Sequence, residues 1–339
     1  MIMEWEFRIA NSNKLKSYKI NRIKNVRIMI RRVLLQAMGV ALLLVSCSDS
    51  NDPGMPDANE KDATFSAIAK QYLDNTVNVT YRSLADNAEQ LVVDLHNIKK
   101  DRSDANVSKA CESFLEARKW WERSEAFLFG AAADFGIDPH IDSWPLDKAG
   151  LVAEMSNESH IVSLAAEDGD AWAGAHLGPE LLGFHGIEYI IFADGNPKSV
   201  SKIPDNELIY AIAVAGDLRN KTYQLELSWG GENSVNADRL AKIEEELEWP
   251  FTVANSGVSY SQNMLNAGKP GSTYRTWTDA MEAIVDGCID ITDEVGTQKI
   301  GKPYTGEDVN YIESPYSHKS ITDFHDNMIS VESAYMGGY

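Results

Sequence analysis

The sequence predicts an all-α protein built from helical bundles. Beyond residue 63, apolar side chains recur at steps of three and four, which is the spacing of one face of a helix. The alternation of apolar and polar residues that is typical of strands is absent from this region. Glycine and proline pairs divide the pattern into segments of helix length. These observations together favour packed helices over a fold that contains a sheet.

Residues 29–47, which read MIRRVLLQAMGVALLLVSC, have the organisation of an export signal. Two arginines precede an apolar run that is shorter than the roughly 20 residues of a membrane span and of the right length for a secretory signal. The junction resembles the lipobox of bacterial lipoproteins, so we expect Cys47 to be lipidated; a simple membrane anchor is the alternative. We assign residues 1–46 to an N-terminal extension plus the signal peptide, and residues 47–62 to a polar tether.

This signal predicts a protein of the bacterial cell envelope, lipid-anchored to the outer membrane and facing the periplasm or the cell surface. Such a compartment permits disulfides, and the mature chain holds two further cysteines, Cys111 and Cys288. The sequence leaves open whether a disulfide joins these two cysteines. Two separate buried thiols are the favoured interpretation, because the cysteines lie far apart in sequence and each falls in a helix-like segment.

The composition indicates a folded protein with an acidic surface. Hydrophobic residues make up 44% and charged residues 24% of the chain, which argues against disorder. The formal net charge is -20; the first 46 residues hold nine Lys or Arg and two acids, which leaves 22 basic and 49 acidic residues in the remainder. A negatively charged surface repels nucleic acid and attracts cations. We therefore expect no nucleic-acid partner.

Helices are expected along most of the mature chain. The first is long enough to suggest a break near residues 75–80, and Gly136 closes the second. Pro179 stands in the first turn of another, a position that proline prefers, and Gly230 with Gly231 stops the next. In chain order the helices cover residues 64–100, 105–135, 148–155, 160–167, 178–193, 204–229, 236–249, 274–295 and 318–336. Loops are expected at residues 137–147, at 257–271 around a short helical centre, and at 296–315.

A domain boundary is expected either in the loop at residues 194–204, which is rich in Asp, Gly and Pro, or at Gly230 and Gly231, and we place it near residue 200. Residues 63–200 would then form an N-terminal bundle and residues 201–339 a C-terminal bundle. An odd final helix suggests that the second bundle is truncated.

The sharpest motif is GFHGIE, residues 183–188, in an otherwise apolar helix. His185 and Glu188 are three residues apart and share a helix face, so their side chains can converge on one point. Gly183 and Gly186 each cost about 1 kcal/mol of helix propensity relative to alanine, which hints at close approach by another element. A buried His and Glu must be paired or metal-bound. A His–Glu hydrogen bond and a metal site both remain open.

A second group of charges lies in ARKWWERSEAFLFG. Glu122 and Glu125 are three residues apart, and Arg118 precedes Glu122 by one turn, where a surface ion pair would contribute a few tenths of a kcal/mol. The aromatic neighbours indicate burial instead. Carboxylates and imidazoles that project inward from facing helices are the donors of metal sites in bundles. Asp142 would add a carboxylate from the loop, in which Asp138, His140 and Asp147 are weaker candidates.

Several blocks resemble the imelysin-like family: WERSEAFLFG, IDSWPLD, GFHGIEYIIF, the segment from YRTW to DEVGTQKIGKPY, and ESPYSHKSITDFHDN. The family's G-x-H-x-x-E motif is matched by Gly183, His185 and Glu188, and the resemblance runs over residues 64–336. It implies a two-domain helical bundle with the functional site at the domain interface. Related iron-uptake domains take their metal ligands from an equivalent His-x-x-Glu and from carboxylates on an earlier helix. The resemblance therefore implies as metal ligands His185, Glu188, Glu122, Glu125 and Asp142.

The favoured function is transition-metal binding in iron uptake, with iron as the expected ion, zinc as the alternative, and other iron-uptake proteins as partners. A metallopeptidase of the insulin-cleaving type, which the family also contains, is the first alternative, although no His-Glu-x-x-His motif is present. The second alternative is a surface lipoprotein that binds a protein or haem partner; no Cys-x-x-Cys-His haem signal supports it.

Overall fold

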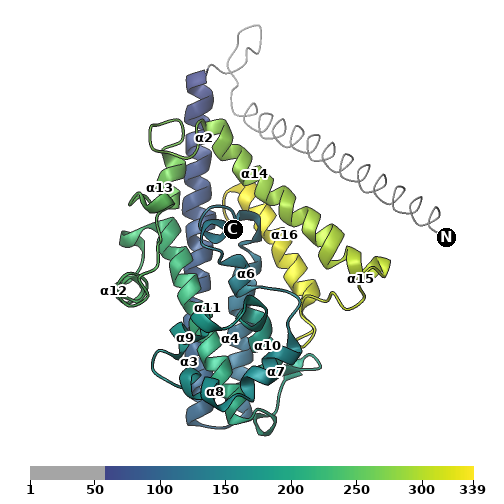
Figure 1. Cartoon of the computed structure of the whole chain (residues 1–339). Helices are drawn as coiled ribbons and strands as arrows, with labels where there is room; N and C mark the ends of the chain where they lie inside the picture. The colour runs from purple at the N-terminus through teal and green to yellow at the C-terminus, as the bar shows by residue number, and fades with distance from the viewer. Residues whose placement is uncertain (1–57) are drawn as a thin grey trace, which may run out of the picture. The chain divides into compact units, whose positions relative to one another are not determined.

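The structure is a computed structural model, and it describes residues 58–339. The predicted signal peptide, the predicted lipidation site Cys47 and most of the predicted tether lie outside the described residues. Residues Asn59–Tyr339 form one compact unit that is almost entirely helical, so the all-α prediction is confirmed (Figure 1). Among the described residues, the strands are the two-residue β1 (Phe192–Ala193) and β2 (Asn196–Pro197), which pair antiparallel in a small hairpin.

The α-helices carry the fold, and short 3-10 and π-helical turns join several of them. The first half of the unit contains α2 (Ala58–Tyr72), α3 (Asn78–Lys100), α4 (Asp104–Glu122), α5 (Ala131–Asp134), α6 (Asp138–Ile141), α7 (Lys148–Met155), α8 (Glu158–Leu164), α9 (Gly169–His176) and α10 (Gly183–Ile191). The second half contains α11 (Asp205–Gly230), α12 (Ala237–Ala241), α13 (Tyr260–Leu265), α14 (Trp277–Glu294), α15 (Gly301–Thr305) and α16 (Ser320–Met336).

The helix α3 packs against both α4 and α11, and α16 packs against both α4 and α14. The core that these helices share buries large aromatic side chains, among them Trp121, Trp229, Tyr81 and Phe127. Burial of such rings is a major stabilising contribution, of about 25 cal/mol per Å² of apolar surface removed from water. Because α11 follows residue 200 and packs along α3, the predicted boundary near residue 200 separates helices that share a core; the boundary itself stays a prediction.

The first predicted helix contains a π-helical turn where a break is expected. Residues Leu73–Val77 form this turn and connect α2 to α3 without interruption. In the turn, the buried Thr76 donates its hydroxyl to the carbonyl oxygen of Ser333 at 3.0 Å. The extra residue of a π turn thus coincides with a contact between the first helix and α16. The helix also begins at Ala58, so its first turn takes up the end of the segment predicted as a tether.

The second predicted helix is too long in the sequence-based assignment. It ends at Glu122, because the N–H and the hydroxyl of Ser124 both bond to the carbonyl oxygen of Trp121, at 2.8 and 2.6 Å. In a continuing helix that oxygen would accept from the N–H of Glu125. Gly130, with a φ of 71°, then separates α5 from the preceding turns. Glu122 and Glu125 therefore do not share a regular helix face.

Other boundaries differ from the predictions for local reasons. The helix expected from residue 178 begins at Gly183, whose φ is +65°. The charged helix expected to reach residue 249 ends near Glu246, because Glu248 adopts a φ of 52° and the N–H of Trp249 turns back to the carbonyl of Ile243 at 3.0 Å. The segment predicted as a loop over residues 296–315 contains α15, and α9 forms in a stretch where no helix is expected.

Both described cysteines are free and buried, as favoured by the sequence. Burial raises the pKa of each thiol, Cys111 and Cys288, to about 12. In a Cys47→Ser chain at pH 8, we expect both thiols to react with a disulfide reagent about a hundredfold or more slowly in native buffer than in denaturant, because the thiolate is the reactive form. Rapid release of two equivalents from the folded chain would contradict this expectation.

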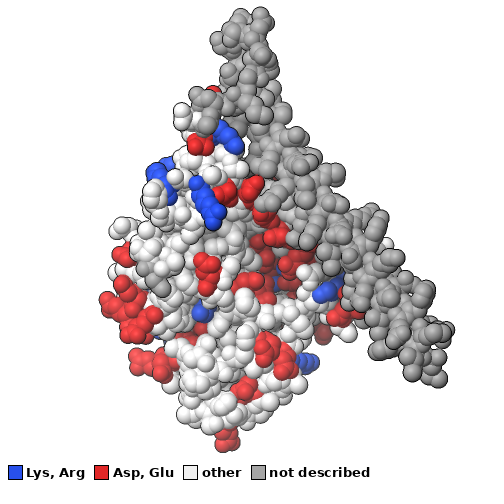
Figure 2. All heavy atoms as spheres, turned by 45° about the horizontal axis from the view of Figure 1, so that its top comes forward, with Lys and Arg blue, Asp and Glu red and all other residues white. Residues whose placement is uncertain are grey.

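Acidic side chains are spread widely over the face of the molecule in Figure 2, and basic ones are fewer. This distribution agrees with the composition of the mature chain. No helix among residues 58–339 combines the length and the apolar character needed to cross a bilayer.

Candidate metal centre

The candidate site forms where the start of α10 meets the end of α6, which pack together (Figure 1). Gly183 opens α10 in the left-handed region, and a Cβ at this position would lie 1.8 Å from the carbonyl oxygen of Ile141. Glycine alone combines this backbone conformation with so close an approach. The contact brings the following residue, Asp142, beside His185, whose Nε2 lies 3.0 Å from Asp142 Oδ1.

Glu313 completes a group of three close donors. It reaches Asp142 and His185 from the segment that precedes α16, and one donor atom of each residue lies within 4.8 Å of the others. All three side chains are 5% exposed or less, so they meet in the protein interior. Donors held about 2.0–2.2 Å from one ion lie within about 4.4 Å of each other, so a small closure would let the group hold a metal. One imidazole with two carboxylates suits iron or zinc.

Arg118, on α4, connects three buried carboxylates. Its guanidinium lies 2.6 Å from Glu122 Oε1 and 2.8 Å from Glu313 Oε1, and it also pairs with Asp142. The Arg118–Glu122 pair is thus an interior ion pair and not the surface pair that the spacing alone would allow. Trp121 adds a hydrogen bond from Nε1 to Asp142 Oδ2 at 2.9 Å, which fixes the orientation of this carboxylate.

Lys299 is a second buried cation, in the turn that follows α14. Its Nζ lies 3.4 Å from Glu313 Oε1, 3.8 Å from Glu122 Oε2 and 3.9 Å from Glu125 Oε1. Glu122 also accepts a hydrogen bond from Asn327 Nδ2, on α16, at 2.5 Å. The predicted ligands Glu122 and Glu125 therefore border the three-donor group and face protein cations.

Glu188 lies one turn beyond His185 but outside the three-donor group. Its Oε1 accepts from the N–H and the hydroxyl of Ser317, at 2.8 and 2.6 Å, which ties α10 to the segment before α16. Its Oε2 is buried and has no hydrogen-bond partner among the described residues. The imidazole of His185 pairs with Asp142 and not with Glu188, so the His–Glu bond considered from the sequence is not formed.

The charges of the site do not balance. Burial raises the pKa of Glu122 to about 8 and also raises the pKa of Glu125. Burial opposes the charge of Asp142 too, but the Arg118 guanidinium holds the pKa of Asp142 well below its usual range. Arg118 and Lys299 are the buried cations that pair with the buried carboxylates Glu122, Glu125, Asp142 and Glu313. Two further buried carboxylates, Glu188 and Asp323, accept hydrogen bonds from Ser317 and Ser314 instead. Protonation of the carboxyls whose pKa is raised offsets part of this surplus, and a bound metal ion would take the place of those protons.

The weaker candidates of the predicted loop have other partners. His140 Nε2 lies 2.7 Å from Asp217 Oδ2, on α11. Asp147 caps α7 by accepting from the N–H of Gly150 at 3.0 Å. Asp138 opens α6, and burial raises its pKa to about 6.

Glu313 and Lys299 are the residues of the centre that the sequence did not identify as ligands or counter-ions. Glu313 stands in the block ESPYSHKSITDFHDN, whose resemblance to a family was the available signal. Lys299 lies in the block DEVGTQKIGKPY, which also resembles the family but has no charge pattern that indicates a role. Their roles depend on contacts with α4, which is distant in the chain.

Three comparisons place the chain among known proteins. It is 27% identical over 266 residues to the iron-regulated protein A of Synechococcus elongatus, a match that covers 78% of this chain and 63% of that relative. The solved structure of a candidate iron-regulated protein A precursor from Parabacteroides distasonis has a TM-score of 0.68 at 26% identity, over 85% of this chain and 77% of the other. A family model described as Imelysin matches residues 78–339.

Proposed function

The chain belongs to the imelysin family, and from that premise we propose that it binds a transition-metal ion, iron in the first place, for iron uptake at the cell envelope. The observation that carries the proposal is the buried group of Asp142, His185 and Glu313, whose donor atoms lie within 4.8 Å of one another. The similarity to proteins named for regulation by iron supports the choice of iron. Zinc is the alternative ion, because it accepts the same donors.

The binding chemistry follows from the donors. Asp142 and Glu313 supply anionic oxygen, and His185 supplies a neutral imidazole nitrogen. Trp121 orients Asp142 through its indole N–H, as outer partners of metal ligands commonly do. Arg118 contacts both carboxylates, so a metal ion and the guanidinium compete for the same oxygens. Glu188 and Glu122 are the other ligands predicted from the sequence: Glu188 follows His185 by one turn of α10, and Glu122 pairs with Arg118.

The envelope location is part of the same proposal. Residues 29–47 support it, because they have the organisation of a lipoprotein signal that ends at Cys47. A lipid on Cys47 would hold the helical unit at the outer membrane, where other iron-uptake proteins would be its partners. Retention of a Cys47→Ser chain in the membrane fraction would contradict this anchor.

The central test is metal binding by the mature chain. We expect His185→Ala to weaken iron or zinc binding about tenfold or more, since loss of one ligand removes a bond that solvent replaces poorly. Elemental analysis and titration with each ion measure stoichiometry and affinity. His176→Ala is a matched control, because His176 is exposed on α9. Equal binding by the wild type and the His185→Ala chain would remove His185 from the site.

A peptidase activity is the second candidate, favoured by the peptidase name that the family model carries. Its test is hydrolysis of unfolded insulin chains by the wild type, with and without a chelator. Turnover that depends on metal and on His185 would rank this function above uptake. Metal binding without turnover would support the uptake proposal.

A further inference from the structure

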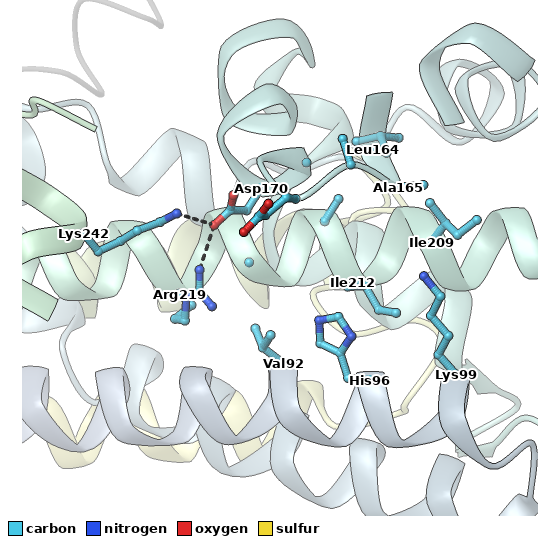
Figure 3. A pocket seen from close by; sticks show the side chains of 15 residues that line it. Val92, His96, Lys99, Leu164, Ala165, Asp170, Ile209, Ile212, Arg219 and Lys242 are labelled. Atoms are coloured by element: carbon cyan, nitrogen blue, oxygen red, sulfur yellow. Dashed lines mark hydrogen bonds and ion pairs between the residues drawn. The ribbon is translucent and has the colours of Figure 1, made fainter. Parts of the chain in front are cut away.

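A cavity of about 420 Å³ lies on the unit away from the candidate metal centre. It is bordered by α3, by α11, and by the segment that runs from the end of α8 into α9 (Figure 3). Its volume falls within the range of roughly 300–1,000 Å³ that is usual for small-molecule sites. None of the three close metal donors lines it, so the two sites are separate.

The cavity carries a local excess of basic groups on an acidic protein. Lys99, Arg219 and Lys242 line it together with two acids, Glu167 and Asp170. Asp170 is already engaged: its Oδ2 lies 2.7 Å from Arg219 and 3.1 Å from Lys242 (Figure 3). This arrangement contrasts with the net charge of -20 for the whole chain. The lining of the cavity is therefore more basic than the molecule as a whole, and Lys242 also pairs with Glu246 at 3.0 Å.

Lys99 is the cation that remains for a ligand. Among residues 58–339, no acidic side chain lies within ion-pair distance of its Nζ. Figure 3 shows Lys99 and His96 extending from α3 toward Ile209 and Ile212 on α11. Partial burial and the nearby Lys99 and Lys100 lower the pKa of His96. A ligand would thus meet the Lys99 ammonium beside the imidazole ring of His96.

The cavity also has an apolar wall. Val92 and Leu164 are buried side chains of the core, and Ile209 and Ile212 are partly buried against it. These four side chains come from α3, α8 and α11 and line the cavity together. An aliphatic group placed against them would leave water, with a gain of about 25 cal/mol per Å² of apolar surface.

We propose that this cavity binds an amphipathic monoanion, namely a medium-chain aliphatic carboxylate, with its carboxylate at Lys99 and its chain against Val92, Leu164, Ile209 and Ile212. A charged head and an apolar body are both needed to match the lining. The proposal is independent of metal binding, because the cavity and the metal centre share no lining residue or donor.

The test is calorimetric titration of the full chain with decanoate at pH 7. We expect saturable binding with one equivalent, and binding of decanol, which lacks the charge, weaker by about tenfold or more. Lys99→Gln should weaken decanoate binding about fivefold or more. Lys100→Gln is the matched control, since both lysines are exposed on the same helix and Lys100 does not line the cavity.

A steric variant separates the cavity from surface charge. Ala165 is exposed and lines the cavity, so Ala165→Trp would fill its entrance without disturbing the core, and should abolish decanoate binding. Circular dichroism checks that each variant is folded. Absence of saturable decanoate binding by the wild type would overturn the proposal. Equal losses in the Lys99 and Lys100 variants, or full binding by Ala165→Trp, would overturn it as well.

Discussion

Replacement of Arg118 by glutamine is expected to lower the free energy of unfolding by about 3–5 kcal/mol at pH 7. Arg118 is 2% exposed and contacts Glu122, Asp142 and Glu313. Its removal leaves these carboxylates in the interior with less positive charge, and an uncompensated buried charge is strongly destabilising. Urea denaturation in the presence of a chelator measures the loss.

The same substitution should act in the opposite direction on metal binding. Because the guanidinium occupies oxygens of Asp142 and Glu313, an Arg118→Gln chain should bind iron or zinc about tenfold more tightly, and metal should restore part of its lost stability. Arg123→Gln is the control, since Arg123 pairs with Asp326 and is more exposed. A weaker metal affinity in Arg118→Gln, in a chain that still folds, would show that the ion does not use these oxygens.

The second large effect is expected from the carboxylates themselves. A double variant, Asp142→Asn with Glu313→Gln, keeps the shape of both side chains. It removes the two carboxylates of the three-donor group and leaves the imidazole of His185. We expect its metal affinity to fall at least about a hundredfold, which corresponds to about 2.7 kcal/mol. The amide oxygens can still accept from Arg118, so the fold should persist. Titration with iron and zinc, with circular dichroism as a check on folding, measures both quantities.

Glu188→Gln is the informative comparison for the double variant. The sequence motif pairs Glu188 with His185, whereas the fold pairs His185 with Asp142 and bonds Glu188 to Ser317. A ligand set centred on Asp142, His185 and Glu313 predicts a small effect of Glu188→Gln. If Glu188→Gln removes binding and the double variant retains it, the ligands are those of the sequence motif.

Much of the fold was accessible from the sequence, because helix formation depends on local periodicity. The spacing of apolar residues predicted α3, α11, α14 and α16, and the all-α class with them. Boundaries were less accessible where one backbone contact decides them. The end of α4 depends on the bonds that Ser124 makes to Trp121, and the start of α10 depends on the conformation of Gly183.

The sequence by itself determined the helical class, the acidic character and the chemical types at residues 142 and 185. The tertiary structure decided which of these groups meet. Asp142 reaches His185 because Gly183 lets α10 approach Ile141, and Glu313 reaches both from a segment before α16. Arg118 and Lys299 then oppose part of the negative charge. Periodicity reports which face of a helix is buried, but a donor group assembled from three separate elements depends on how those elements pack.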